Sequence, residues 1–174
     1  MTGVRRAAAM LVVAALACSK GETPRGAAFR PLQVGDRAPA YTTHGLNGDT
    51  VTVGAGAPVL LNVWATWCTS CREEMADLAA LSRAYAPKGV KVVAVSVDVG
   101  DGSRVRRFAD AEQLPFVVAH DPGGEVQRVF QAVGVPETYL ISGDGTMLWV
   151  QRGGIHGTAG AVRATLDSVV GHLQ

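Results

Sequence analysis

The sequence predicts an α/β fold in which helices and strands stack in layers around a largely parallel sheet. Short runs rich in β-branched residues, bounded by Gly, Pro or Asp, alternate with segments whose apolar residues recur at helical spacing. Such alternation is typical of a sheet covered by helices. Two turn signals add antiparallel hairpins, one near the start of the folded region and one late in the chain.

The composition excludes several classes of protein. The chain has 174 residues, of which 48% are hydrophobic and 18% charged, so it is too apolar for a disordered protein. Three cysteines are too few for a disulfide scaffold. A formal net charge of +1 without a long basic run argues against a nucleic-acid partner. We therefore expect a single globular domain that binds no nucleic acid.

The first 17 residues have the pattern of a secretory signal peptide. Arg5 and Arg6 precede the apolar run 7–17, which ends in small residues. This run is shorter than the ~20 residues that a membrane-spanning helix needs. We therefore expect residues 1–17 to direct export and to lie outside the fold.

Cys18 follows this run and suggests a lipid anchor. Small residues before a cysteine resemble a bacterial lipobox, in which the cysteine is lipidated, although Ala15 stands where Leu is usual. Plain cleavage at an Ala-x-Ala-like site is the alternative. Residues 18–33 contain Gly and Pro with little periodicity, so we expect a flexible tether there and the folded domain over residues 34–174.

The first half of the domain is expected to contain a hairpin, two buried strands and a helix between them. Asn47-Gly48 lies between alternating residues, which is a strong hairpin signal. The elements are a hairpin of 41–43 and 50–53, strands over 59–64 and 91–97, and a helix over 73–85 with Met75, Leu78, Ala79, Leu81 and Tyr85 on one face.

The second half continues the alternation and ends in a helix. Its elements are a helix over 105–111, a strand over 115–119, a helix over 126–131, a strand over 138–141, a turn over 142–145, a strand over 147–150 and a helix over 161–173. The turn predicts an antiparallel pair at one edge of the sheet. The closing helix places Val162, Leu166, Val169, Val170 and Leu173 on one face.

A C-x-x-C motif lies where the strand 59–64 gives way to a helix, within Trp64-Ala65-Thr66-Trp67-Cys68-Thr69-Ser70-Cys71. Unpaired N–H groups and the positive end of the helix dipole stabilise a thiolate at that position. Cys71 lies one turn further inside, so we expect Cys68 to attack and Cys71 to resolve the mixed disulfide. The following Arg72 adds a positive charge that favours the thiolate.

Three other uses of the two cysteines fit less well. A structural disulfide would close a very short loop and remove little chain entropy. A zinc site needs a second pair of ligands, and haem attachment needs a His where Arg72 stands. The four histidines are interpreted as surface or loop residues rather than metal ligands: His44, His120, His156 and His172. We therefore expect no metal and no cofactor beyond the redox-active pair.

The chain resembles the thioredoxin-like superfamily, and within it the TlpA/ResA-type envelope thiol-disulfide oxidoreductases. The resemblance rests on four segments of the predicted domain: 34–39 (VGDRAP), 61–75 (LNVWATWCTSCREEM), 95–98 (VSVD) and 134–141 (GVPETYLI). It implies a thioredoxin-like three-layer fold with a central mixed sheet, an N-terminal β-hairpin and a helix–strand insertion, the last matched by residues 105–121.

The resemblance also implies roles for individual residues. Pro136 would be a cis-proline whose loop lies beside the disulfide, and Val135 would offer its backbone to an extended client segment. Glu74 would accept the proton of Cys71, a task that ordinary thioredoxins give to an Asp where Asn62 stands; the alternative for Glu74 is a solvated helix carboxylate. The residues expected to bind or border the client are Trp67, Thr69, Ser70, Val135 and Glu137.

The expected function is disulfide reduction in exported proteins, with apocytochrome c before haem attachment as the leading client by resemblance. A membrane thiol donor would re-reduce the pair, and a lipid on Cys18 would hold the protein on the periplasm-facing side of a membrane. Two alternatives remain open on the same fold: a peroxiredoxin-like peroxidase, and a module that binds or delivers monovalent copper through Cys68 and Cys71.

Overall fold

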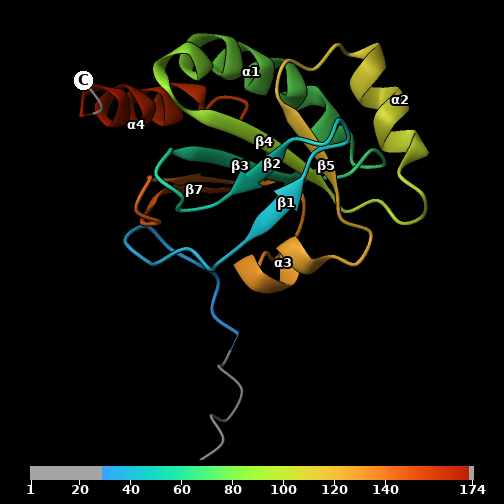
Figure 1. Cartoon of the computed structure of the whole chain (residues 1–174), viewed down its shortest axis with the longest axis horizontal. Coiled ribbons are helices and arrows are strands. Elements are labelled where there is room, and N and C mark those ends of the chain that lie inside the picture. Colours follow the sequence, from blue (N-terminus) through green and yellow to red (C-terminus); the bar gives the residue numbers. More distant parts are fainter. Residues whose placement is uncertain (1–28, 173–174) are drawn as a thin grey trace, which may run out of the picture.

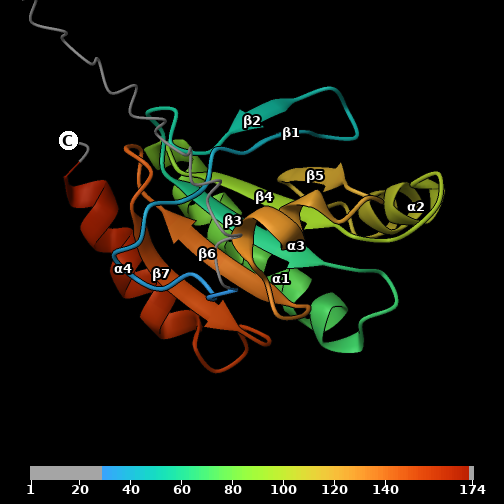
Figure 2. The same cartoon turned by 90° about the horizontal axis from the view of Figure 1, so that it is seen from below.

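The computed structural model describes residues 29–172, which form a mixed sheet covered by helices (Figures 1 and 2). The predicted signal peptide, Cys18 and most of the predicted tether lie outside these residues. Contacts with the domain begin at Arg30, whose N–H donates to Gln131, while Arg152 donates to the Leu32 carbonyl. Within residues 29–172, no helix has both the length and the apolar composition needed to cross a membrane.

The central sheet has five strands in the order β5-β4-β3-β6-β7. The strands are β3 (Val59–Trp64), β4 (Lys91–Ser96), β5 (Val117–His120), β6 (Glu137–Ile141) and β7 (Met147–Arg152). β3 runs parallel to β4, and β4 parallel to β5, whereas β6 is antiparallel to both β3 and β7. The predicted mixed sheet is confirmed. The antiparallel pair of β6 with β7 was expected from the turn at 142–145. The antiparallel pair of β3 with β6 was not expected from the alternation, and it leaves two of the four pairs parallel.

The parallel pairing stops at β6. The connection from β5 to β6 contains the six-residue helix α3 (Glu125–Phe130) and brings the chain in beside β3, antiparallel to it. The predicted turn at residues 142–145 then adds β7 antiparallel to β6.

The other helices are α1 (Thr69–Tyr85), α2 (Ser103–Ala111) and α4 (Ala159–Gly171), with a short 3₁₀ turn at Ala86–Lys88. In Figure 1, α1 and α4 lie above the sheet and α3 lies below it. α2 packs at the α1 side, where Phe108 meets the buried Trp64 ring at a centroid distance of 5.2 Å. The predicted three-layer arrangement is confirmed.

Alternation along β3 divides the core in two, although all six of its residues are buried. Leu60 and Trp64 join the cluster under α1 and α4, while Leu61 and Val63 join the cluster that faces α3 and the hairpin. Because side chains alternate across the sheet, Asn62 lies on the α1 side. A polar residue at the centre of an apolar strand thus faces the helix that bears the cysteines.

The N-terminal hairpin pairs β1 (Thr42–His44) with β2 (Thr50–Thr52), as predicted, although β1 begins one residue later and β2 ends one residue earlier than expected. The connection runs through Gly48, whose φ of +91° favours glycine. The hairpin attaches to the edge of β5, since the Leu46 N–H donates to the Val118 carbonyl at 2.7 Å. β5 itself begins two residues later than predicted because Pro115 has no N–H for the sheet.

Candidate redox site

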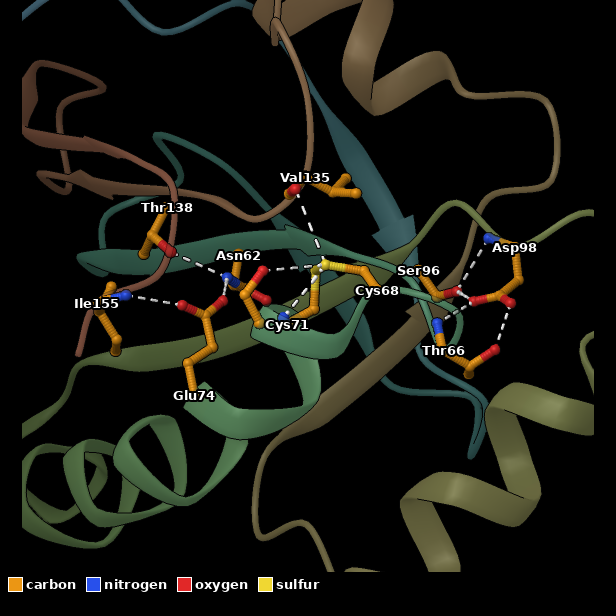
Figure 3. The surroundings of a disulfide bond; sticks show 11 residues. Asn62, Thr66, Cys68, Cys71, Glu74, Ser96, Asp98, Val135, Thr138 and Ile155 are labelled. Atoms are coloured by element: carbon orange, nitrogen blue, oxygen red, sulfur yellow. Dashed lines mark hydrogen bonds between the residues drawn. A yellow bond between two sulfur atoms is a disulfide. The ribbon is translucent and has the colours of Figure 1, made fainter.

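Cys68 caps the N-terminus of α1, at the point where the central strand β3 has just ended (Figure 3). Its backbone is extended, and its sulfur accepts the N–H of Cys71 at 3.2 Å. The same geometry would stabilise a thiolate on Cys68 in the reduced protein. The predicted helix start at residue 73 lay four residues too late, because the first turn of α1 has a capping sulfur rather than an apolar face.

The two cysteines form a disulfide and differ in exposure. Cys68 is 8% exposed, whereas Cys71 is 0% exposed. A thiol of an incoming molecule therefore meets Cys68 first. This asymmetry agrees with the predicted order, in which Cys68 attacks and Cys71 resolves.

The loop before β6 lies directly beside the disulfide. The Val135–Pro136 peptide bond is cis, as the resemblance implied. The Val135 carbonyl oxygen lies 3.8 Å from the Cys68 sulfur (Figure 3). The structure therefore brings Val135 and Pro136 together with Cys68. Their contact with a client stays a prediction.

Exposed side chains border the pair on its helix side. Ser70 Oγ lies 3.5 Å from the Cys68 sulfur, and Thr69 beside it is exposed. Trp67 directly precedes Cys68 and is 62% exposed, whereas Trp64 is buried in the core as expected. Thr69, Ser70 and Trp67 thus surround the reactive sulfur, in positions that a bound client could touch.

Glu74 is completely buried, at 0% exposure, so the alternative of a solvated helix carboxylate is wrong. It lies one turn after Cys71 on the same face of α1. Its Oε1 accepts from Asn62 Nδ2 at 2.8 Å, and its Oε2 accepts from the Ile155 N–H at 2.9 Å. Figure 3 shows this carboxylate beside the first turn of α1, between Asn62 and Ile155.

The electrostatics of Glu74 favour its protonated form. Burial raises the pKa of Glu74 above its usual value near 4.5, although the N–H donors of Ile155 and Asn62 and the nearby His156 oppose this shift. His156 also pairs with Asp77, one turn further along α1, at 2.7 Å. A carboxylate with a raised pKa is a stronger proton acceptor than an ordinary glutamate.

Asn62 was not predicted as a site residue, because an asparagine cannot take the proton-accepting role of the Asp that ordinary thioredoxins have at this position. In the structure it connects Glu74 to β6, since its Nδ2 also donates to Thr138 Oγ1 at 2.9 Å. Its Oδ1 is buried without a hydrogen-bond partner among the described residues. The available signal was its polarity within an otherwise apolar strand, which indicates a buried contact.

Asp98 was also missed, although it ends one of the segments that carry the resemblance. It is 3% exposed and lies just after β4, on the other side of the disulfide from Glu74 (Figure 3). Its carboxylate accepts the N–H of Thr66 at 2.7 Å and the hydroxyls of Thr66 and Ser96 at 2.5 and 2.7 Å. These three donors connect β4 to the turn that precedes Cys68.

Glu137 contacts the loop before β6 rather than the disulfide. Glu137 is buried, and its Oε2 accepts the Val133 N–H at 3.0 Å. Its Oε1 forms an ion pair with Arg152 Nε at 3.1 Å without a hydrogen bond. It alternates with Thr138 along β6 and therefore points to the α3 side. Its carboxylate holds the start of the loop that ends in Val135, while its predicted contact with a client stays untested.

A three-layer α/β fold with an N-capping cysteine, a sealed second cysteine and a cis-proline loop over them defines a thioredoxin-like thiol-disulfide oxidoreductase. Comparison with known proteins places the chain more narrowly. The profile of the AhpC/TSA family matches residues 34–150, and the chain belongs to this family.

Thiol-disulfide oxidoreductase ResA of Oceanobacillus iheyensis is 35% identical over 148 residues, which cover 82% of this chain and 72% of that protein. Among solved structures, a Chlorobium tepidum protein described as thiol:disulfide interchange protein DsbE superposes with a TM-score of 0.71. It shares 30% identity and covers 80% of this chain and 99% of its own. StoA from Bacillus subtilis shares the fold, with a TM-score of 0.65 and 22% identity. The match covers 75% of this chain and 98% of StoA. The chain is thus a thiol-disulfide oxidoreductase of ResA/DsbE type, with disulfide-bearing proteins as substrates and Cys68–Cys71 as its redox pair.

Proposed function

We propose that the protein reduces disulfides in exported client proteins, with apocytochrome c before haem attachment as its leading client. The observation that carries the proposal is the arrangement of the pair: an accessible Cys68, a sealed Cys71 and a buried carboxyl, Glu74, on the same helix face as Cys71. A reductase needs this division of labour, because its second thiol must lose a proton while shielded from other oxidants.

The reaction transfers two electrons and two protons to the client. The Cys68 thiolate attacks one sulfur of the client disulfide, whose S–S bond breaks as the Cys68–client S–S bond forms, and the released client thiolate takes up a proton. The Cys71 thiolate then attacks the Cys68 sulfur, so that the Cys68–Cys71 bond forms and the second client thiol is released. The client is reduced and the protein is left oxidised, in the state of Figure 3.

Glu74 is proposed to accept the Cys71 proton in the second step. In the oxidised protein its carboxylate contacts Asn62 and Ile155 and makes no hydrogen bond to the disulfide. In the reduced protein, a thiol on Cys71 would lie one helical turn away on the same face. The raised pKa of Glu74, caused by burial, suits a group that must accept a proton from a thiol.

Exposed apolar side chains near the pair favour a protein client. Three of the five large hydrophobic side chains that the described residues expose lie on segments next to the site: Trp67 before Cys68, Val99 after Asp98, and Val133 before Val135. Such side chains can cover apolar residues that flank a cysteine in an unfolded client. An unfolded apocytochrome, with a cysteine pair awaiting haem, is a substrate of this kind.

The cell envelope is the proposed location. A signal peptide over residues 1–17, a lipid on Cys18 and a tether before the domain would place the site on the periplasm-facing side of a membrane. In that oxidising compartment the pair needs a membrane thiol donor to return it to the reduced state.

A trapping experiment tests the client reaction. With Cys71→Ser in the full chain, the first step proceeds and the second cannot, so mixed disulfides with client proteins should accumulate on Cys68 and disappear on reduction. Cys68→Ser is the matched control and should trap nothing. Apocytochrome c among the trapped proteins supports the named client, and an envelope extract without any trapped species would contradict the proposal.

The reduction potential of the purified chain separates reductase from oxidase. Equilibration with glutathione or dithiothreitol should give a value near thioredoxin's, about −270 mV, whereas about −120 mV would mean disulfide donation. Stoichiometric peroxide that oxidises the thiols within seconds would instead favour the peroxidase alternative. A copper titration in which only the reduced pair binds tightly would favour the metal-binding alternative.

A further inference from the structure

Asp98 fixes the turn that carries Cys68. Thr66, in this turn, gives both its N–H and its hydroxyl to the Asp98 carboxylate. The Val97 N–H donates to the Trp64 carbonyl at 2.9 Å, so the segments after β3 and β4 are joined at two successive points. Cys68 lies two residues beyond Thr66, and its own N–H donates to the Ala65 carbonyl at 3.2 Å.

The support for Asp98 extends outward to neighbouring strands. Ser96 Oγ donates to the carboxylate and accepts the Asp98 N–H at 3.1 Å, while His120 Nε2 lies 2.7 Å from the Asp98 carbonyl, to which it donates. Asp98 is therefore held through its N–H, its carbonyl and both carboxylate oxygens. A side chain held in this way cannot turn away from Thr66 without the loss of several hydrogen bonds.

The carboxylate is ionised in this environment. Burial is the largest single influence and opposes the charge, but the hydrogen bonds from Thr66 and Ser96 together outweigh it and hold the pKa of Asp98 below its usual value. Arg104, an exposed residue of α2, adds a weaker attraction. A fixed negative charge thus lies beside the turn that leads to the reactive cysteine.

This charge acts against the N-terminus of α1. The helix dipole and the Cys71 N–H favour a thiolate on Cys68, whereas the buried Asp98 anion, bound to Thr66 two residues before Cys68, disfavours one. Two successive Cα–Cα steps span at most ~7.6 Å, so Thr66 keeps Asp98 close to Cys68. Across about 10 Å at an effective dielectric constant of about 20, one unit charge changes a thiol ionisation constant by roughly tenfold.

We propose that Asp98 is a positioning residue that holds the Cys68 turn and, through its buried negative charge, keeps the Cys68–Cys71 pair reducing. A less stable thiolate makes the reduced form less favourable, so the dithiol gives up its electrons more readily. The inference rests on the direction of electron flow proposed above. It deepens that proposal, because it names a group outside the cysteine motif that sets the direction.

The test compares Asp98→Asn with the wild-type chain in two measurements. Asparagine keeps the shape and an oxygen for the Thr66 N–H but removes the charge. We expect the pKa of the Cys68 thiol to fall by about one unit and the equilibrium constant with glutathione to shift about tenfold toward the dithiol. For this two-electron couple, the tenfold shift is about 30 mV. Asp101→Asn, an exposed aspartate of the same loop, is the matched control and should leave both values unchanged.

A second variant keeps the test informative if Asp98→Asn does not fold. Ser96→Ala removes one donor but leaves the charge, so the pKa of Cys68 should rise slightly, in the opposite direction to Asp98→Asn. Unchanged Cys68 ionisation in both variants, or a shift of the same sign in both, would overturn the proposal and leave Asp98 with a structural role alone. The wild-type potential tests the proposed function, whereas these differences test Asp98, so either can fail without the other.

Discussion

Two buried carboxylates lie on opposite sides of the disulfide, and their surroundings push their pKa values in opposite directions. Glu74 on α1 receives two N–H donors and has its pKa raised by burial. Asp98 after β4 receives three donors, two of them hydroxyls, and has a lowered pKa despite burial. The deeper burial of Glu74 outweighs its two donors, whereas the three donors of Asp98 outweigh the effect of burial.

The difference assigns different tasks to the two groups. A carboxyl with a raised pKa can serve an acid–base step, whereas a carboxylate that stays charged can only orient its neighbours and set a local potential. The side toward Glu74 is thus suited to proton transfer and the side toward Asp98 to fixed electrostatics. The predictions below test this division, beginning with the largest expected effect.

Glu74→Gln should slow the release of reduced client by about 10²-fold or more at neutral pH, since a general base typically contributes 10²–10⁴-fold. The first step on Cys68 should keep its rate, which a rapid-quench assay with a disulfide-bonded peptide resolves. Glu73→Gln removes the same charge from an exposed neighbour and should behave as wild type. Equal slowing of both steps would contradict a role confined to Cys71.

The pH dependence of folding stability should differ in sign between the two sides. Because the pKa of Glu74 is raised on folding, the contribution of Glu74 to the unfolding free energy is fully present below about pH 4.5. This contribution falls as the pH rises through the folded pKa. Because the pKa of Asp98 is lowered, its contribution is present above about pH 3.8 and falls as the pH drops through the folded value.

Denaturant unfolding of the oxidised chain from pH 3 to pH 8 measures both effects, at about 1.4 kcal/mol for each unit of pKa shift. Relative to wild type, Glu74→Gln should gain stability as the pH rises, and Asp98→Asn should recover stability as the pH falls. Parallel curves for the two variants would mean that the two environments do not differ as described.

In the pH–rate profile of the second step, in which Cys71 releases the client, the rate should rise with pH. Asn62→Leu should move this rising limb by up to about one pH unit toward higher pH. The change removes the donor to Glu74 Oε1, and a hydrogen bond to a charged group is worth about 1.5–3 kcal/mol. Thr138→Val removes the other partner of Asn62 and should leave the limb in place. The same shift in both variants would point to general loosening of β3 against β6.

His156→Ala should have the smallest effect, a loss of less than about 1 kcal/mol in unfolding free energy, because its pair with Asp77 is partly solvent-exposed. The pH limb should move by no more than about 0.3 unit, since the buried donors remain in place. Asp77→Asn should have an effect of similar size on stability, but it should move the pH dependence the opposite way, because Asp77 raises the pKa of Glu74 whereas His156 lowers it. A shift as large as that of Asn62→Leu would mean that the surface pair, rather than the buried donors, governs Glu74.

Features that depend on local sequence could be predicted. The apolar run 59–64 identified β3, and the cysteine motif after it identified the reactive end of the domain. The cis peptide at Pro136 followed from the resemblance alone, because an X-Pro bond is cis in only about 5–6% of cases. The same resemblance assigned Glu74 to the site, and its burial excludes the alternative of a solvated carboxylate.

Contacts between distant segments could not be predicted. The donor to Glu74 Oε2 is the backbone N–H of Ile155, 81 residues away, and a backbone group leaves no mark in the sequence. Thr66 and Asp98 are 32 residues apart, and both are ordinary residues for a turn. The antiparallel direction of β6 beside β3 likewise had no local signal in the sequence. Long-range geometry, rather than residue type, supplied what the sequence lacked.

The position of β3 at the middle of the sheet has a consequence for engineering and for evolution. It separates Glu74 and its neighbours from Asp98 and its neighbours, which share no hydrogen-bond partner. Substitutions at sites without shared partners tend to combine additively. A designer could therefore adjust the thermodynamic drive of the enzyme on one flank and its turnover on the other, and natural selection has the same two independent adjustments available.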